Sequence, residues 1–189
     1  MFEHLRARLG EAVFGFTEAA PADQKEGPRE ACFRTVPDRL LEVLRCLRDD
    51  STLRFGFLQN LTAIDWPKVP PAGEIEVVYH LYSYPLRHEA VLKVSVPRDR
   101  PRLPSAAQLW RNANWLEREQ YDLLGVVFDG HPDLRRLLLP DDWVGHPMRK
   151  DYQEAAEYRG MPTTRPSPMD LLATYDKAHK PVTPDKSGS

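Results

Sequence analysis

Two adjacent runs of alternating polar and apolar residues limit what this chain can fold into. In residues 74–84 and 89–96 every second residue is apolar: Ile75, Val77, Tyr79 and Leu81, then Ala90, Leu92, Val94 and Val96. A period of two places such side chains on one face of a strand. The stretch Pro85-Leu86-Arg87-His88 between the runs supplies a turn. The sequence therefore predicts a long antiparallel hairpin with one apolar face.

Three segments around this hairpin show helical spacing. Residues 1–10 carry Phe2, Leu5 and Leu9, and a second helix opens at Pro37 with Leu40, Leu41, Leu44 and Leu47 in one stripe. Ser105-Ala106-Ala107-Gln108 reads as a capping box, which predicts a third helix from there to about Leu124, ending at Gly125. A further strand is expected at Leu53–Leu58, and Pro97, Pro101 and Pro104 are expected to prevent ladder pairing.

These elements predict an α+β fold, a mainly antiparallel sheet packed with helices, because no strand–helix–strand alternation is visible. Residues 1–155 are expected to form a single domain, with a loop or edge element at residues 19–30. Residues 156–189 are expected to form an extended C-terminal tail, because this stretch is rich in proline and has only one short apolar patch, at Met169–Leu172. Such a tail orders only against a partner.

Composition excludes several classes of function. The 189 residues carry a net charge of -2, so no basic field attracts nucleic acid. No apolar run approaches the roughly 20 residues of a membrane span, and the N-terminus does not resemble a secretory signal. The two cysteines, Cys32 and Cys46, are too few for an iron–sulfur cluster or a four-cysteine zinc site. Gly-rich phosphate loops and the Gly-x-Ser-x-Gly elbow are also missing.

Charged and turn-forming residues crowd together in residues 117–152, where Gly-His-Pro occurs twice, at 130 and at 145. The candidate site residues of this region are Glu117, Arg118, Glu119, Asp122, Gly130, His131, Pro132, Asp133, Arg135, Arg136, Trp143, Gly145, His146, Pro147, Arg149, Lys150, Asp151 and Tyr152. We interpret them as a docking or structural element in which the carboxylates of residues 117, 119 and 122 pair with the basic side chains. Trp143 and Tyr152 are expected at an interface and Trp110 in the core.

A metal site is the alternative for the same stretch. His131, Asp133 and His146, with the carboxylates of Glu119 and Asp122, could supply nitrogen and oxygen ligands. However, no compact ligand spacing such as His-Glu-x-x-His occurs, and the neighbouring arginines and lysines would neutralise the carboxylates. A pair of carboxylates acting as general acid and base is disfavoured for the same reason. No catalytic, cofactor-binding or metal-binding residue is therefore expected.

The spacing of these residues resembles a known family. The pattern is Glu117-Arg118-Glu119-x-x-Asp122-Leu123-Leu124, six residues, His131-x-x-x-Arg135-x-Leu137-Leu138, and then Pro140-Asp141-Asp142-Trp143-x-Gly145-His146-Pro147-x-Arg149-Lys150-Asp151-Tyr152. It resembles the C subunit, or 30-kDa subunit family, of respiratory complex I, the proton-pumping NADH:quinone oxidoreductase. The similarity covers roughly residues 35–155, with Met148 where leucine is usual and Leu124 where phenylalanine is common.

The resemblance implies an α+β subunit of the peripheral arm that binds no cofactor itself, while FMN and iron–sulfur clusters lie in partner subunits. It further implies packing against the D subunit, which holds the quinone site, with the B and I subunits nearby, on the cytoplasmic side of the bacterial inner membrane. The chain would scaffold the electron path from NADH to quinone in an unfused form, without the sequence of that D subunit. Residues 117–152 and the tail would then be the docking surface.

Two other functions remain open from the sequence. One is the equivalent subunit of a related membrane-bound hydrogenase or of another donor:quinone dehydrogenase complex, because one small subunit is not enough to distinguish these from complex I. The other is a stand-alone metal-dependent hydrolase that uses His131, Asp133 and His146.

Overall fold

A computed structural model describes residues 2–17, 31–70 and 72–163 of the chain. The loop or edge element predicted at residues 19–30, and the part of the predicted tail after Thr163, lie outside the described residues. The chain divides into two compact units, Met1–Tyr152 and Gln153–Ser189. The predicted domain boundary after residue 155 stays a prediction.

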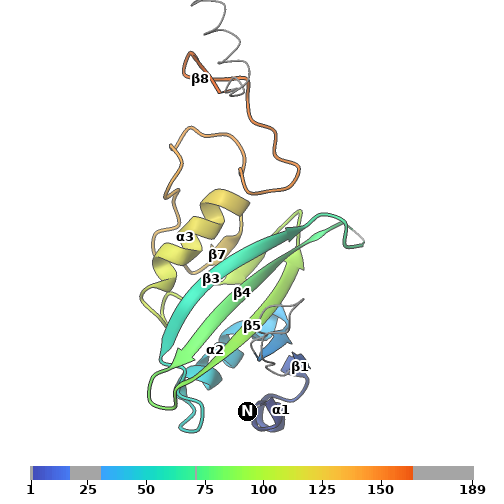
Figure 1. Cartoon of the computed structure of the whole chain (residues 1–189), viewed down its shortest axis with the longest axis vertical. Helices are drawn as coiled ribbons and strands as arrows, with labels where there is room; N and C mark the ends of the chain where they lie inside the picture. The colour runs from blue at the N-terminus through green and yellow to red at the C-terminus, as the bar shows by residue number, and fades with distance from the viewer. Residues whose placement is uncertain (1, 18–30, 71, 164–189) are drawn as a thin grey trace, which may run out of the picture. The chain divides into compact units, whose positions relative to one another are not determined.

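A five-stranded sheet with the order β1-β2-β5-β4-β3 organises the first unit (Figure 1). Its strands are β1 (Val13–Thr17), β2 (Cys32–Thr35), β3 (Phe57–Trp66), β4 (Glu74–Ser83) and β5 (His88–Pro97). β4 and β5 form the predicted antiparallel hairpin, with Val77 opposite Val94 and Leu81 opposite Ala90. All eight apolar residues that alternate in this hairpin are buried, so this prediction is confirmed.

The helices lie on one face of this sheet, and the core fills the space between the two layers (Figure 1). Helix α2 (Leu40–Asp49) follows a 3-10 turn (Pro37–Arg39), while α3 (Ala113–Leu124) lies against β3. Helix α1 (Phe2–Leu9) and a 3-10 turn (Gly10–Ala12) lead into the edge strand β1. The mainly antiparallel α+β class is confirmed; among the described strands of the five-stranded sheet, one pair, β2 and β5, is parallel.

The third helix begins later than its capping signal predicts. Ser105 does cap a turn, since its Oγ accepts the backbone N–H of Ala107 at 3.1 Å. That turn does not continue, and α3 starts only at Ala113. Asn112, just before it, donates its side-chain N–H to the carbonyl of Leu58 at 2.5 Å and so ties the start of the helix to the edge strand β3.

The strand predicted at Leu53–Leu58 is also misplaced. Residues 51–53 form a turn, Arg54 has a left-handed backbone with φ of 50°, and β3 extends from Phe57 to Trp66. A bulge between Leu58 and Asn60 shifts the register of β3 against β4. The bulge breaks the two-residue period of the buried positions, so the sequence of this strand shows no regular alternation and its bounds were not predicted.

The three prolines do not prevent ladder pairing, contrary to the prediction: Pro97 ends β5 opposite Glu74, and Pro104 ends another short strand. β6 (Arg102–Pro104) pairs in parallel with β7 (Val127–Asp129). Pro101 takes part as an acceptor: its carbonyl accepts the N–H of Val127 at 2.8 Å. At the other end of the pair, Ser105 donates its N–H to the carbonyl of Asp129 at 2.8 Å. Proline lacks a donor but keeps its acceptor, so this register tolerates it.

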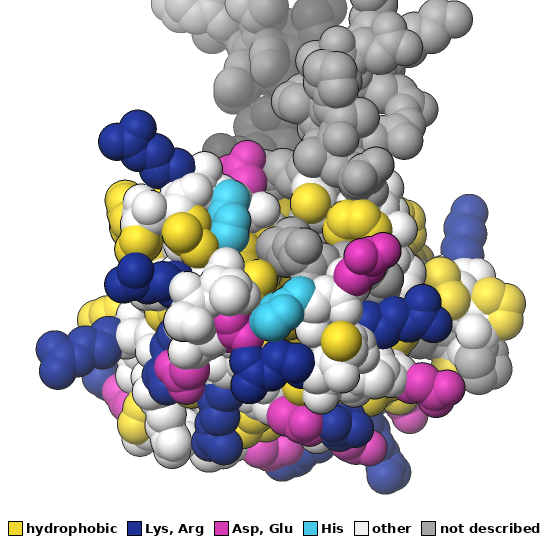
Figure 2. All heavy atoms as spheres, turned by 90° about the horizontal axis from the view of Figure 1, so that it is seen from below, with side chains coloured by type: hydrophobic (Ala, Val, Ile, Leu, Met, Phe, Trp, Pro, Cys, Tyr) yellow, Lys and Arg dark blue, Asp and Glu magenta, His cyan; other side chains and the backbone are white. Residues whose placement is uncertain are grey.

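Acidic and basic side chains are interspersed over the end of the molecule seen in Figure 2, and the described residues form no patch of one sign there. In the second unit, the described part contains a small hairpin, β8 (Glu157–Tyr158) and β9 (Met161–Pro162). None of the described helices is long and apolar enough to cross a membrane.

Candidate functional site

Asp122 of α3 organises the segment that follows β7, residues 130–152. Its carboxylate is fully buried, and Oδ2 accepts the consecutive backbone N–H groups of Leu137, Leu138 and Leu139 at 3.0, 2.7 and 2.9 Å. Oδ1 accepts a hydrogen bond from Arg136 Nη1 at 2.8 Å. Desolvation alone would raise the pKa of Asp122, but these hydrogen bonds together outweigh it and lower the pKa. The carboxylate therefore stays ionised.

Arg136 extends this contact to the second Gly-His-Pro motif. Its Nη2 donates to the carbonyls of Trp143 at 2.8 Å and Gly145 at 3.2 Å. His146 donates Nδ1–H to the carbonyl of Asp122 at 3.0 Å. Burial lowers the pKa of His146, and the neighbouring charges of Arg149 and Arg136 lower it further, so this ring is neutral near pH 7.

Two other arginines bind carbonyl groups rather than carboxylates. Arg118 donates to the carbonyls of Arg135 at 3.2 Å and Arg136 at 3.0 Å. Arg149 donates Nε–H to the carbonyl of Leu124 at the end of α3, at 2.8 Å. These hydrogen bonds satisfy backbone acceptors of a helix end and of an irregular segment. Arg118 of α3 thus holds the backbone of the 130–152 segment, and Arg149 of the segment holds the end of α3.

A buried polar cluster surrounds Glu117, the first residue of the charged motif. Its carboxylate accepts Ser105 Oγ–H at 2.6 Å and the N–H of Ala106 at 2.6 Å. Burial raises the pKa of Glu117 to about 7, although both hydrogen bonds oppose the rise. Burial, and secondarily the charge of Glu117, also raises the pKa of Tyr79.

His131 faces the same carboxylate, with Nε2 lying 3.9 Å from Glu117 Oε2. The ring donates Nε2–H to the carbonyl of Asn114 at 3.1 Å and accepts the N–H of Asp133 at Nδ1 at 3.0 Å. Both hydrogen bonds require the neutral tautomer with its proton on Nε2. His131 is thus a fixed structural side chain with both nitrogens in use.

The end of the 130–152 segment is attached to the sheet by residues that the sequence did not single out. Asp65, at the end of β3, accepts two hydrogen bonds from Arg98, at 2.6 and 3.0 Å, and the backbone N–H of Lys150 at 2.7 Å. Arg98 also pairs with Asp151. Its hydrogen bonds lower the pKa of both carboxyl groups. The available signal in the sequence was an aspartate shortly before the proline-containing stretch of residues 67–73.

The predicted carboxylate–arginine pairs are only partly present. Asp122 and Arg136 form one, but Glu117 binds a serine and a backbone amide, and Arg135 pairs with Asp133 in an exposed ion pair. Lys150 contributes its backbone N–H. The sequence pattern does not distinguish these roles. Backbone carbonyl groups compete with carboxylates for guanidinium donors, and a sequence motif does not show which carbonyl groups are within reach.

The remaining predicted site residues are exposed or half-buried. Glu119 is half-buried and has no hydrogen bond or ion pair to another described residue, while Gly130 and Pro132 are exposed and Pro147 is half-buried. Tyr152 packs its ring against Gly145, with Tyr152 Cε2 3.0 Å from the point that a Cβ at Gly145 would occupy. Trp143 and Tyr152 are each half-buried.

His131, Asp133 and His146 do not come together as metal ligands. Both ring nitrogens of His131 have protein partners, and Nδ1 of His146 is bound to a carbonyl. Over residues 2–17, 31–70 and 72–163, no group of three or more histidine, cysteine or acidic side chains is arranged to hold a metal ion.

Replacing Gly125 by alanine is expected to destabilise the junction between α3 and the 130–152 segment. Gly125 ends the helix with φ of 77°, and an added Cβ would lie 2.6 Å from His146 Nε2 and 3.1 Å from Arg149 Nη2. The positive φ costs about 1 kcal/mol and the overlap about 1–3 kcal/mol more. Urea unfolding of the variant measures this loss.

Gly130→Ala is the matched control. Gly130 has nearly the same φ, 79°, but nothing lies within 4 Å of an added Cβ. It should show only the backbone cost of about 1 kcal/mol. Equal losses in the two variants would mean that contact with His146 contributes nothing.

Together, the fold and this arrangement define an α+β domain in which charged side chains fix the shape of an irregular surface segment, as expected of a subunit in a larger assembly. Residues 33–158 match the family described as respiratory-chain NADH dehydrogenase, 30 Kd subunit, so the chain belongs to this family.

Curated relatives, named as the C subunit of NADH-quinone oxidoreductase, match over most of their length. The chain is 44% identical over 157 residues to the relative of that name from Roseiflexus sp. (strain RS-1), covering 83% of this chain and 84% of that protein. It is 50% identical over 153 residues to the protein of the same name from Roseiflexus castenholzii, covering 81% and 82% respectively.

Two solved structures share the fold. One belongs to the membrane-bound sulfane sulfur reductase, an archaeal respiratory membrane complex, with a TM-score of 0.63, 26% identity, and coverage of 99% of this chain and 95% of that one. The other is a trypsin-resistant fragment of Nqo5, with a TM-score of 0.53, 33% identity, and coverage of 70% of this chain and 95% of the fragment.

Proposed function

We propose that this chain is a cofactor-free subunit of the peripheral arm of a proton-translocating NADH:quinone oxidoreductase. In this role it scaffolds the path by which electrons pass from NADH, through FMN and iron–sulfur clusters held by other subunits, to quinone. Its partners are the D subunit, which holds the quinone site, with the B and I subunits nearby. The family membership and the relatives named as the C subunit of NADH-quinone oxidoreductase support this assignment.

One structural observation carries the docking role. The 130–152 segment is fixed by Asp122 of α3, by Asp65 of β3 and by its own Arg136, yet it exposes three large apolar side chains, those of Leu138, Val144 and Met148. Exposed apolar groups on a rigid, polar-braced segment are typical of a surface that a partner covers. Because its internal hydrogen bonds already set the shape of this segment, docking costs little conformational entropy.

The proposed location is the cytoplasmic side of the bacterial inner membrane, reached through the complex. Among the described helices, none could cross a membrane, which fits attachment through partner subunits. No catalytic residue is proposed in this chain. Arg136, Arg149 and Asp151 of the segment are bound by carboxylates, carbonyl groups or a guanidinium, which supports a structural role for them.

Affinity capture of the chain from gently solubilised membranes tests the function. We expect a large assembly that contains flavin and iron–sulfur clusters and oxidises NADH with a quinone as acceptor. Recovery of the chain alone, or in an assembly without this activity, would contradict the proposal.

A second candidate is the equivalent subunit of a respiratory complex that uses another electron donor. The fold match to the archaeal sulfane sulfur reductase complex, which covers 99% of this chain, favours keeping it. The donor that reduces the captured complex separates the two. Reduction by NADH supports the first candidate, while reduction only by another donor supports the second.

A further inference from the structure

Glu117 on α3 and His131 after β7 place two titratable side chains next to each other in the interior. Both side chains are fully buried, and His131 Nε2 lies 3.9 Å from Glu117 Oε2. That distance is about 1 Å longer than a hydrogen bond. The Nε2–H group is instead donated to the carbonyl of Asn114 at 3.1 Å. One imidazole N–H therefore lies near two acceptors, a carbonyl group and a carboxyl group.

Glu117 has few hydrogen-bond donors for a buried anion. Its carboxylate accepts one hydrogen bond from Ser105 Oγ and one from the N–H of Ala106. Asp122, further along α3, is equally buried but accepts three backbone N–H groups and Arg136. The pKa of Asp122 is lowered, whereas burial raises the pKa of Glu117 to about 7. A third donor would therefore stabilise the ionised form of Glu117.

Two further polar hydrogens face this carboxyl group, and both belong to titratable side chains. His131 faces it from the turn after β7. Tyr79 faces it from β4, since burial and then the charge of Glu117 raise the pKa of the Tyr79 hydroxyl, which is buried without a hydrogen-bond partner among the described residues. Arg118, next to Glu117 on α3, is bound by backbone carbonyl groups of the 130–152 segment. Burial and hydrogen bonding thus set the pKa of Glu117, without a cation among the described residues.

Of these two donors, His131 lies on the part of the chain that can adjust. Tyr79 lies in the middle of the sheet and is paired with both neighbouring strands, β3 and β5. His131 follows Gly130, which has a φ of 79° and open space around it. A shift of the ring by about 1 Å would bring Nε2–H to Glu117 without breaking a hydrogen bond of the sheet. Asp133, whose N–H is bound to Nδ1 at 3.0 Å, would move with the ring.

We propose that Glu117 and His131 form a proton-operated switch, in which His131 donates Nε2–H to the carbonyl of Asn114 while Glu117 is protonated and to Glu117 while it is ionised. The direction follows from acceptor strength, because a carboxylate accepts a stronger hydrogen bond than a neutral carbonyl group does. His131 changes its acceptor and not its protonation, and the proton that Glu117 releases passes to solvent. The switch sets the position of the turn that begins the 130–152 segment. It goes beyond the proposed function and concerns this chain alone.

His131→Phe in the full chain tests the switch through the ionisation of Glu117. Phenylalanine keeps a ring but has no N–H, so ionised Glu117 loses the donor that the switch supplies. The infrared band of the protonated carboxyl group, expected to disappear with a midpoint near pH 7 in the wild type, should then have a midpoint about one pH unit higher. An unchanged or lower midpoint would overturn the switch.

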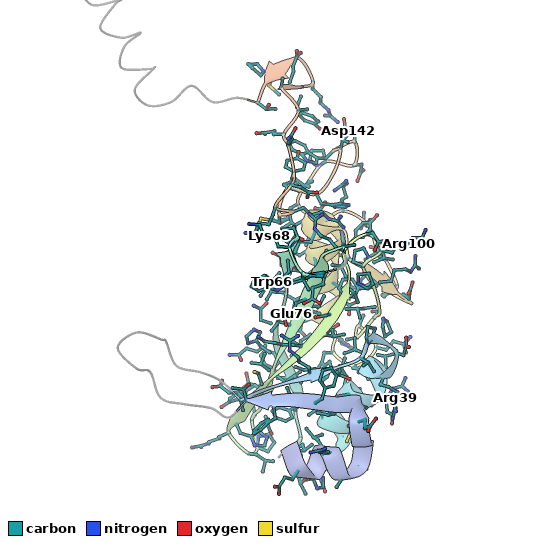
Figure 3. All side chains as sticks on the ribbon, turned by 90° about the vertical axis from the view of Figure 1, so that its right-hand side faces the viewer. Arg39, Trp66, Lys68, Glu76, Arg100 and Asp142 are labelled. Carbon is teal, nitrogen blue, oxygen red and sulfur yellow. The ribbon has the colours of Figure 1, made fainter. Side chains whose placement is uncertain are left out.

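Two control variants separate the contribution of His131 from other changes. Tyr79→Phe removes the other buried donor and should leave the midpoint nearly unchanged; a rise equal to that of His131→Phe would contradict the proposal. Glu76→Gln changes a second buried glutamate, labelled in Figure 3, whose carboxylate already pairs with Arg34 and Lys93. Because Glu76 alternates with Tyr79 along β4, it points to the other face of the sheet, and its replacement should leave the band of Glu117 in place.

Nuclear magnetic resonance of the wild-type chain follows the exchange of acceptors directly, so the test does not depend on the folding of a variant. The Nε2–H proton of His131 and the carbonyl carbon of Asn114 should both shift with a midpoint near pH 7, and both shifts should be absent from Glu117→Gln. His146, in the second Gly-His-Pro motif, is the internal reference. It donates Nδ1–H to a carbonyl and its pKa is lowered from 6.5, so it should not respond above pH 7.

Two results of this experiment count against the switch. A shift of His131 without a shift of the Asn114 carbonyl would mean that the ring senses the charge of Glu117 but keeps its acceptor. Protonation of His131 at Nδ1 with the midpoint of Glu117 would mean that the pair exchanges a proton and not an acceptor. Neither result bears on the proposed function, which capture of the complex tests separately.

Discussion

Asp122→Ala should lower the free energy of unfolding by about 3 kcal/mol, the largest loss expected among the side chains that hold the 130–152 segment. The substitution removes the acceptor of three backbone N–H groups and leaves the mostly buried guanidinium of Arg136 without its carboxylate. Removing one partner of a buried ion pair costs more stability than the intact pair contributes, because the remaining charge stays desolvated and unpaired. Urea unfolding at pH 7 measures the loss.

The same variant should show local loosening before global unfolding. The amide protons of Leu137, Leu138 and Leu139 lose their acceptor, so their hydrogen exchange should accelerate far more than that of the β4–β5 hairpin. Asp133→Ala is the control, since Asp133 pairs only with the exposed Arg135, and it should change stability by less than about 0.5 kcal/mol. Similar exchange rates in all three proteins would contradict the role assigned to Asp122.

The stabilising effect of Asp122 should also depend on pH with a definite sign. Its pKa is lowered in the folded protein from an ordinary value of 3.8. Its contribution is therefore complete above that value and is lost as the pH falls below it. The difference in stability between the wild type and Asp122→Ala should shrink in acid.

The sequence predicted the hairpin and the stripe of α2 because both are regular and bury one face. The two-residue period from Ile75 to Val96 and the stripe of leucines on α2 need no knowledge of the rest of the chain. The stripe is only partly right, because Val43 is buried while the predicted Leu41 is half-buried. The same logic failed at β3, where a bulge after Leu58 interrupts the period. It failed at Ser105 because a local cap forms equally well on a turn that ends after a few residues.

The charged motif located the candidate site, but it did not predict which groups form hydrogen bonds with each other there. Glu117, Arg118 and Asp122 are spaced along one helix, which placed them near one another. Which of them meets a carboxylate, a carbonyl or an amide depends on the path of the 130–152 segment, and that path has no period. Asp65 and Arg98 were missed because they lie 33 residues apart in the chain and belong to no local pattern.

Glu117→Gln should remove a stability dependence on pH that the wild type shows between about pH 4.5 and pH 7. The pKa of Glu117 is raised from 4.5 to about 7 in the folded protein by burial. Between these values the folded chain holds a proton that the unfolded chain has released, so stability falls as the pH rises. At about 1.4 kcal/mol per pKa unit, the loss amounts to about 3 kcal/mol and is complete above pH 7.

Glutamine reproduces the neutral carboxyl group in shape. Its Oε1 can still accept the N–H of Ala106, and its amide can donate to Ser105 Oγ in place of the hydrogen bond that the carboxylate accepts. Near pH 4 the two proteins should thus be similarly stable, and by pH 8 the variant should gain up to about 3 kcal/mol relative to the wild type. Unfolding at a series of pH values measures this difference, and parallel curves would contradict the assignment.

The other titratable groups that face Glu117 stay the same in both proteins, which isolates its contribution. These are His131, 3.9 Å away, and Tyr79, whose own pKa is raised by burial. The infrared band of a protonated carboxyl group provides an independent measure, since it should disappear with a midpoint near pH 7 in the wild type and be absent from Glu117→Gln. A carboxyl group that is half-ionised near neutral pH is hydrogen-bonded to Ser105 and lies beside His131, so the stability of the folded protein should vary within the physiological pH range.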